Sequence, residues 1–229
     1  MGLAPEDKII LQPTRVVQRK GIEHAIELVR ALADPRFKLV ITHEAGDEGY
    51  AYVEWLESQA RGCCVDLRLA PVSLEDPWAD SGSAWRAVEN GYTLWDVYGQ
   101  ADLVTYPSLY EGFGNAFLEA IYLQKPILIN RYETFIRDIE PLGFKLATMD
   151  GFLAKSTVQH VRTLLASAEL CADMAAHNYR VAADNFSYHI LEERLGVVIR
   201  NATGDTGYGK PGLEPDQPNI VYLNRGAGF

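Results

Sequence analysis

Residues 102–121 read DLVTYPSLYEGFGNAFLEAI, and this stretch decides the fold. Its first five residues form an apolar run typical of a buried strand, and the segment 115–124 has the apolar content of a helix. The loop between them contains two glycines, Gly112 and Gly114. A strand, a loop and a helix in this order form the repeating unit of α/β proteins with a parallel sheet.

The same alternation extends in both directions from this unit. We expect the other strands at about 8–14, 37–43, 64–70, 126–130 and 144–148. We expect the other helices at about 22–32, 52–59, 92–101, 132–139, 155–166, 169–184 and 187–200. Nearly continuous apolar strands require helices on both faces of the sheet. The predicted fold class is therefore α/β, a doubly wound, Rossmann-like parallel sheet of about six strands.

The chain length suggests one large domain followed by a tail. At roughly 150 residues per domain, 229 residues do not predict an obvious pair. We place the domain at residues 8–200. Six glycines and three prolines among residues 201–229 predict an extended or disordered tail. Residues 71–91 read as a long inserted loop, and a loop of that length is more often functional or mobile than inert.

The charge of the chain limits the classes of partner that we expect it to bind. Lysine and arginine number 21 against 31 aspartates and glutamates, which gives a net charge of −10. Phosphate backbones and anionic lipids repel such a chain, so we expect neither nucleic acid nor a membrane surface as a partner. No stretch reaches the roughly 18 apolar residues of a membrane span. Three cysteines without a metal or disulfide spacing favour a reducing, cytoplasmic location.

A cationic window lies near the start of this acidic chain. Between Lys8 and Ile22 there are four basic residues and no acidic one. Arg15 follows the first predicted strand and Lys20-Gly21 opens the first helix, where strand ends face the ligand crevice of an α/β sheet. Two fixed cations and the amides of a helix start would hold a diphosphate without a metal. A solvated turn whose basic groups pair with nearby acids is the alternative.

The glycine loop of the opening stretch is a second candidate ligand site. Gly112, Phe113, Gly114 and Asn115 lead into the helix, and bare backbone lets a polar ligand reach the amides at its start, where the helix dipole is positive. Glu111 and Glu119 bracket this point. Two carboxylates around a phosphate-binding helix start suit a ligand with hydroxyls on both sides of its phosphates. A nucleotide sugar has that form.

Other uses of these residues fit less well. Gly112-x-Gly114 begins a dinucleotide fingerprint, but Phe117 stands where the third glycine belongs. The chain has no P-loop, no Asp-x-Asp pair and no metal spacing among its histidines, so we expect no metal and no cofactor. A glycosidase pair of Glu111 and Glu119 is disfavoured, because a helix start and an arginine lower the pKa that a general acid needs raised.

These motifs resemble the C-terminal, donor-binding half of retaining GT-B glycosyltransferases of family four, the group 1 glycosyl transferases. The resemblance covers about residues 1–200, including Asp96-x-Tyr98-x-x-Ala101-Asp102 and Pro126. It implies that the donor is a UDP-, GDP- or ADP-hexose. The resemblance implies that Arg15 and Lys20 bind the donor diphosphate and that Glu111 binds the donor sugar. Gly21 and residues Gly112 to Asn115 would contact the sugar and the phosphates. Glu119 would bind the ribose, and Pro71 and Val72 would contact the base.

The resemblance also implies a partner that this sequence lacks. Enzymes of this family have two facing α/β halves, and the N-terminal half supplies the acceptor pocket. Residues 1–7 read as a connector remnant that would enter the second half. We therefore expect a hexosyltransferase donor domain that is inactive alone. A non-catalytic anion- or nucleotide-binding module and an epimerase-type GT-B domain are the alternatives.

Overall fold

The computed structural model describes residues 2–43, 50–70, 72–73 and 92–203. Their centre is one parallel sheet in the order β3-β2-β1-β6-β7-β8. The strands are β1 (Lys8–Gln12), β2 (Phe37–Ile41), β3 (Asp66–Leu69), β6 (Ala101–Tyr106), β7 (Ile127–Asn130) and β8 (Ala147–Met149). The predicted doubly wound α/β sheet of six strands is thus confirmed.

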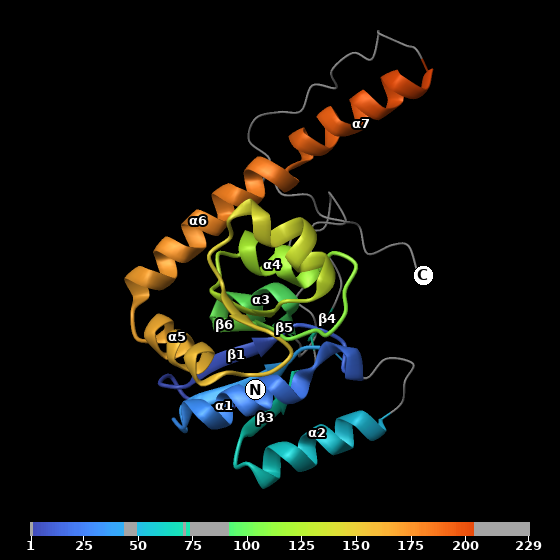
Figure 1. Cartoon of the computed structure of the whole chain (residues 1–229). Helices are drawn as coiled ribbons and strands as arrows, with labels where there is room; N and C mark the ends of the chain where they lie inside the picture. The colour runs from blue at the N-terminus through green and yellow to red at the C-terminus, as the bar shows by residue number, and fades with distance from the viewer. Residues whose placement is uncertain (1, 44–49, 71, 74–91, 204–229) are drawn as a thin grey trace.

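Helices cover both faces of this sheet, as Figure 1 shows. On one face lie α1 (Ile22–Leu32), α2 (Ala51–Gly62) and α5 (Lys155–Leu165), and on the other lie α3 (Leu94–Gln100) and α4 (Asn115–Tyr122). Alternate strand residues enter the two cores: Leu11 and Val104 pack on the α3–α4 side, whereas Ile10 and Leu103 pack on the α1–α2 side. This double burial is why the strands are apolar throughout.

The last two helices leave the sheet. Helix α6 (Ala168–Phe186) runs along one side of the domain, and α7 (Tyr188–Thr203) continues from it away from the sheet (Figure 1). The predicted helix 187–200 therefore extends three residues further, into the segment 201–229 assigned to a tail. Residues 204–229 lie outside the described part of the chain.

One predicted strand is displaced, and one predicted helix lies in place but differs in type. The strand expected at 144–148 is β8 (Ala147–Met149), because the side chain of Asn178 takes both backbone groups of Lys145: the Lys145 amide donates to Asn178 Oδ1 at 2.8 Å and Asn178 Nδ2 donates to the Lys145 carbonyl at 2.7 Å. The helix expected at 132–139 is a π-helical turn, Phe135–Ile139, followed by a 3₁₀ turn at Glu140–Leu142.

The region around the predicted loop 71–91 contains two short strands. β4 (Val72–Ser73) and β5 (Tyr92–Thr93) pair in parallel, so the helix expected from residue 92 begins at Leu94. Thr93 caps α3 because its hydroxyl accepts from the Asp96 amide at 3.1 Å, while the Asp96 carboxylate accepts from the Thr93 amide at 2.9 Å. The remainder of that loop lies outside the described residues.

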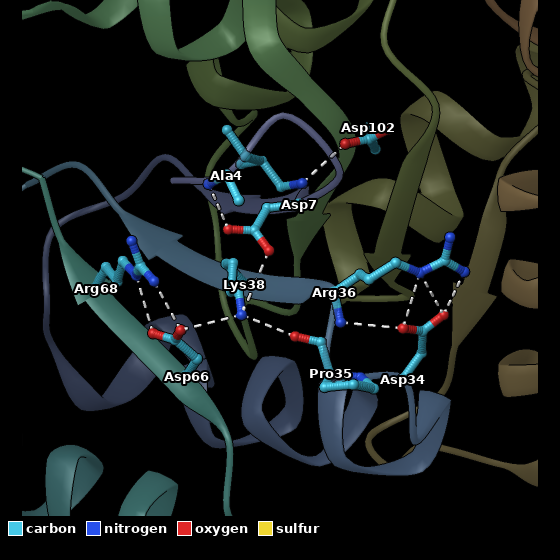
Figure 2. Close-up of polar contacts among 10 residues, drawn as sticks. Ala4, Asp7, Asp34, Pro35, Arg36, Lys38, Asp66, Arg68 and Asp102 are labelled. Carbon is cyan, nitrogen blue, oxygen red and sulfur yellow. Dashed lines mark hydrogen bonds and ion pairs between the residues drawn. The ribbon is translucent and has the colours of Figure 1, made fainter. Parts of the chain in front are cut away.

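Charged side chains join the amino ends of four strands (Figure 2). Lys38 Nζ, on β2, lies 3.5 Å from Asp7 Oδ1 before β1 and 3.3 Å from Asp66 Oδ2 on β3. Asp102 accepts the Ile9 amide at 2.8 Å and so joins β6 to β1 at the same edge. Strand ends at this edge therefore bond to one another, and the opposite, carboxyl edge is where ligands bind in such sheets.

Candidate functional site

The candidate site lies at the carboxyl ends of β1 and β6. These two strands are neighbours, and the strand order reverses direction between them. The loop after β1 leads through Arg15 to the start of α1, and the loop after β6 leads through Glu111 to the start of α4. Ligands of open α/β sheets bind in the crevice at such a reversal point.

The two loops are in direct backbone contact. The Leu109 amide donates to the Arg19 carbonyl at 2.9 Å. Gly21 has φ 61°, and a Cβ on it would lie 2.5 Å from the Pro107 carbonyl oxygen. Only glycine allows both this backbone conformation and this close approach. The predicted Gly21 therefore has a structural reason of its own: it lets the start of α1 lie against the loop after β6.

A buried ion pair joins the loops at their side chains. Lys20 Nζ donates a hydrogen bond to Glu111 Oε1, and Arg19 Nη1 lies 3.4 Å from Glu111 Oε2. Lys20 and Glu111 are 8% and 9% exposed. Burial lowers the pKa of Lys20 below its usual 10.5, and the charges of Arg19 and Arg15 act in the same direction, while the Glu111 carboxylate opposes the shift. The site thus concentrates cationic charge that one carboxylate neutralises only in part.

The structure brings Lys20 of the cationic window against Glu111, which precedes the glycine loop. Arg15 is exposed, and its charge acts on Lys20. Arg19 belongs to the predicted window but was not assigned a site role. Its side chain donates to the Tyr110 carbonyl at 3.4 Å and lies beside Glu111. No local spacing distinguishes Arg19 from Arg15, so only the tertiary fold identifies it as the second cation on Glu111.

The two predicted glycines of the second loop differ in their surroundings. Gly114 precedes α4 with φ 106°, and a Cβ on it would lie 2.8 Å from the Tyr106 hydroxyl oxygen. A Cβ on Gly112 would meet no heavy atom of the described residues within 4 Å, its chain neighbours aside, so its bare face opens to space that a ligand can occupy. Packing within the chain therefore requires a glycine at position 114 but not at position 112.

Two buried tyrosines lie beneath this loop. The Tyr132 hydroxyl donates to the Phe113 carbonyl at 2.7 Å, and the rings of Tyr106 and Tyr132 pack edge to face with centroids 6.3 Å apart. The Tyr106 ring centroid is 5.7 Å from Lys20 Nζ. Burial and the nearby Glu111 carboxylate raise the pKa of both tyrosines, so their hydroxyls stay protonated. The Tyr132 hydroxyl thus ties the loop to the core through the Phe113 carbonyl.

Phe113 and Asn115 occupy the loop in different ways. The Phe113 ring packs edge to face on Phe186, with centroids 5.0 Å apart, and is half-buried against the core. Asn115 is exposed as the first residue of α4, where the unbonded helix amides lie.

Glu119 is buried on α4, one turn inside the helix. It is 7% exposed, and its Oε2 accepts from the Tyr98 hydroxyl at 3.1 Å. The same hydroxyl lies 3.3 Å from the carbonyl oxygen of Ala116. Tyr98 was part of the quoted Asp96-x-Tyr98 motif, but no sequence pattern connects it with Glu119, which is 21 positions away.

Buried polar side chains support both loops. Thr105 donates to Gln12 Oε1 at 2.8 Å, and Gln12 Nε2 donates to Thr14 Oγ1 at 2.8 Å, which joins the ends of β6 and β1. Asn130, at the end of β7, donates to the Ser108 carbonyl at 2.9 Å and accepts the Gly151 amide at 2.8 Å. These bonds fix the loops from which the site is built.

The predicted base-binding residues lie at the limit of the described structure. Val72 begins β4, shortly after the end of β3, and Pro71 lies outside the described residues. Within the described ranges, no three His, Cys, Asp or Glu side chains group as metal ligands would. Nor does any helix in this part of the chain combine the length and apolar content that crossing a bilayer requires.

Comparison with known proteins identifies relatives. Residues 88–181 match the family model of glycosyl transferases group 1. The chain is 35% identical over 166 residues to a mannosylglucosylglycerate synthase of Petrotoga mobilis, covering 65% of this chain and 37% of the relative. It is 31% identical over 214 residues to the synthase of that name from Thermotoga maritima, covering 85% and 49%. The chain thus spans less than half of the length of these relatives.

Solved structures share the fold. The structure of Anabaena Alr3699/HepE in complex with UDP has a TM-score of 0.68 at 14% identity, covering 86% of this chain and 49% of that one. The C-terminal domain of a glycosyl transferase group 1 family protein, LpcC, from Francisella tularensis has a TM-score of 0.60 at 17% identity, covering 80% of this chain and 87% of that one.

Proposed function

We propose that this chain, which belongs to the group 1 glycosyl transferases, is the donor domain of a retaining, metal-independent hexosyltransferase. It would bind a nucleotide-diphosphate sugar, and a second half would bind the acceptor. One observation supports this above the others: the cations Lys20 and Arg19 from the loop after β1 lie against Glu111 and the glycine loop after β6. The groups proposed for the diphosphate thus come from two distant segments of the chain.

The chemistry of sugar transfer explains the need for these groups. Transfer breaks the bond between the anomeric carbon and the diphosphate, so negative charge develops on the departing phosphate oxygens. Lys20, Arg15 and the amides at the start of α4 would stabilise that charge in place of a metal. Removing one such preorganised donor typically costs about 2.7–4 kcal/mol of transition-state stabilisation. Retention of anomeric configuration is supported by the family resemblance alone.

The two glutamates would hold the ends of the donor. Glu111 would accept hydrogen bonds from the sugar hydroxyls, and Glu119 from the ribose. Both are buried beside the glycine loop, one before it and one inside α4. Carboxylates that accept from hydroxyls orient a substrate without changing protonation state. The base would lie near Pro71 and Val72.

The relatives suggest which donors to test first. HepE was solved with UDP, and two relatives are named for making mannosylglucosylglycerate. The ligands to be tested are therefore UDP, GDP and ADP, each with glucose or mannose attached, and we refer to them as the panel.

Thermal unfolding with this panel tests the proposal. A ligand at about 100 times its dissociation constant adds roughly 2.7 kcal/mol to the folded state, and each kcal/mol raises Tm by about 2–4 °C in a domain of this size. We expect at least one nucleotide sugar to raise Tm by about 5–10 °C, equally with magnesium and with EDTA. A shift that needs magnesium would overturn metal independence, and inorganic diphosphate acting as well as every nucleotide would favour a plain anion-binding module.

A further inference from the structure

A tyrosine outside the two loops donates a hydrogen bond to one carboxylate of the candidate site. The hydroxyl of Tyr98, on α3, donates to Glu119 Oε2 on α4 at 3.1 Å. Tyr98 is fully buried and Glu119 is 7% exposed. The contact joins two helices on the same face of the sheet (Figure 1).

The surroundings of Glu119 make this bond important. Its neighbours along α4, Leu118 and Ala120, are buried apolar residues, and the helix packs in the α3–α4 core. A carboxylate in such surroundings is costly unless hydrogen-bond donors satisfy it. A hydroxyl that donates to a carboxylate helps to satisfy it and restricts the rotamer of the acceptor.

The Tyr98 hydroxyl is itself held in place. The Thr93–Asp96 capping box fixes the start of α3, and the ring of Trp95 stacks on that of Tyr98 with centroids 6.3 Å apart. The hydroxyl also lies 3.3 Å from the carbonyl oxygen of Ala116 in the first turn of α4. Its position is thus defined by α3 and by the beginning of the helix that bears Glu119.

We propose that Tyr98 is a positioning residue that sets the Glu119 carboxylate for the ribose hydroxyls of the nucleotide. The inference rests on the proposed donor site and adds a specificity device to it. A carboxylate fixed before binding loses little entropy when it accepts from the ribose, so the site discriminates between nucleotides with and without those hydroxyls. Without the Tyr98 hydroxyl, Glu119 loses one of the contacts that restrict its rotamer, and discrimination falls.

The test compares each nucleotide with its 2′,3′-dideoxy form. Dissociation constants are measured by titration calorimetry for the diphosphate that binds best among UDP, GDP and ADP, and for its dideoxy analogue. We expect Tyr98→Phe to weaken binding of the ribonucleotide about fivefold to tenfold, the value of roughly one hydrogen bond, and to leave the dideoxy analogue unchanged. Glu119→Gln should likewise lose the preference for the ribonucleotide over its dideoxy analogue. The double variant Tyr98→Phe/Glu119→Gln should lose no more of this preference than either single variant.

Tyr52→Phe is the matched control. The Tyr52 hydroxyl, on α2, also donates to a glutamate, Glu23 Oε2 on α1, at 2.5 Å, on the opposite face of the sheet. The control should keep wild-type discrimination. Equal weakening of both nucleotides in Tyr98→Phe, or unchanged discrimination in either site variant, would overturn the positioning role. A wild-type chain that binds none of the three diphosphates would instead overturn the proposed function.

Discussion

The ammonium of Lys20 and the carboxylate of Glu111 form a buried hydrogen-bonded ion pair across 91 positions of the sequence. The pair joins the loop after β1 to the loop after β6 at the point where the strand order reverses. Its members are also the groups proposed for the diphosphate and the sugar. In the proposed complex, Lys20 would therefore bind the donor diphosphate and Glu111 at the same time. The pair thus has a structural role and a proposed binding role, and mutations can separate the two.

Removing either member of this pair should destabilise the fold, and removing both should cost less than the sum. Lys20→Met leaves the Glu111 charge buried beside Arg19 alone, and we expect a loss of roughly 3 kcal/mol in the free energy of unfolding. Glu111→Gln should cost a similar amount, because three cations then lie together. The double variant should fall short of the sum by about 1–3 kcal/mol. Urea unfolding of the four proteins measures this, and strict additivity would show that the two side chains do not interact.

The two glycines of the loop should separate binding from folding. Gly112→Ala meets no neighbouring atom of the described chain, so we expect unfolding free energy within about 0.5 kcal/mol of wild type. A methyl group there would occupy the ligand's space, and nucleotide affinity should fall about tenfold or more. Gly114→Ala is strained at φ 106° and meets the Tyr106 hydroxyl, so it should cost about 1–3 kcal/mol of stability. If Gly112→Ala binds the nucleotide as wild type does, the ligand does not approach that backbone.

The stability of the fold at alkaline pH should depend on the buried hydroxyl of Tyr106. The pKa of Tyr106 is raised above its usual 10.0 by burial and by Glu111, so the unfolded chain loses this proton near pH 10 while the folded chain keeps it. The stability due to Tyr106 is therefore complete below pH 10 and declines above it, by up to about 1.4 kcal/mol per pH unit. Tyr106→Phe should show a shallower decline of Tm between about pH 9.5 and 11.

The lowered pKa of Lys20 acts in the opposite direction in this range, because the unfolded chain binds that proton more tightly. Lys20 is present in both proteins, so the comparison of slopes still reports on Tyr106. Identical slopes would mean that the Tyr106 hydroxyl is not buried against Glu111 as described.

The parts of the fold that depend on local pattern were predictable from the sequence. Strands such as β7 are buried at every position because both faces of the sheet are covered, and Gly21 and Gly114 precede helices as the sequence indicated. β8 was misplaced because Asn178, 33 positions from Lys145, takes the backbone groups that would otherwise extend the strand. Non-local hydrogen bonds of this kind leave no periodic signal.

The candidate site was likewise predictable in its local segments but not in its long-range contacts. The cationic window and the glycine loop are recognisable from charge and composition, and the doubly wound topology brings strand ends together. The partnership of Tyr98 with Glu119 and of Arg19 with Glu111 depends on how α3, α4 and the loops pack, which composition does not encode. A sequence thus predicts the segments that form a site more readily than the pairs of atoms that meet in it.

Arg15 should affect turnover without affecting the fold. Its side chain is exposed and near Lys20, so Arg15→Ala should keep the unfolding free energy within about 0.5 kcal/mol. In a two-domain enzyme containing this chain, we expect kcat to fall about 100-fold or more while donor affinity changes little, because the charge on the leaving diphosphate is greatest in the transition state. Arg61→Ala, another exposed arginine, on α2, is the matched control and should retain wild-type kcat. A variant whose Michaelis constant rises while kcat is unchanged would assign Arg15 to ground-state binding, and the leaving group would then depend on Lys20 and the α4 amides.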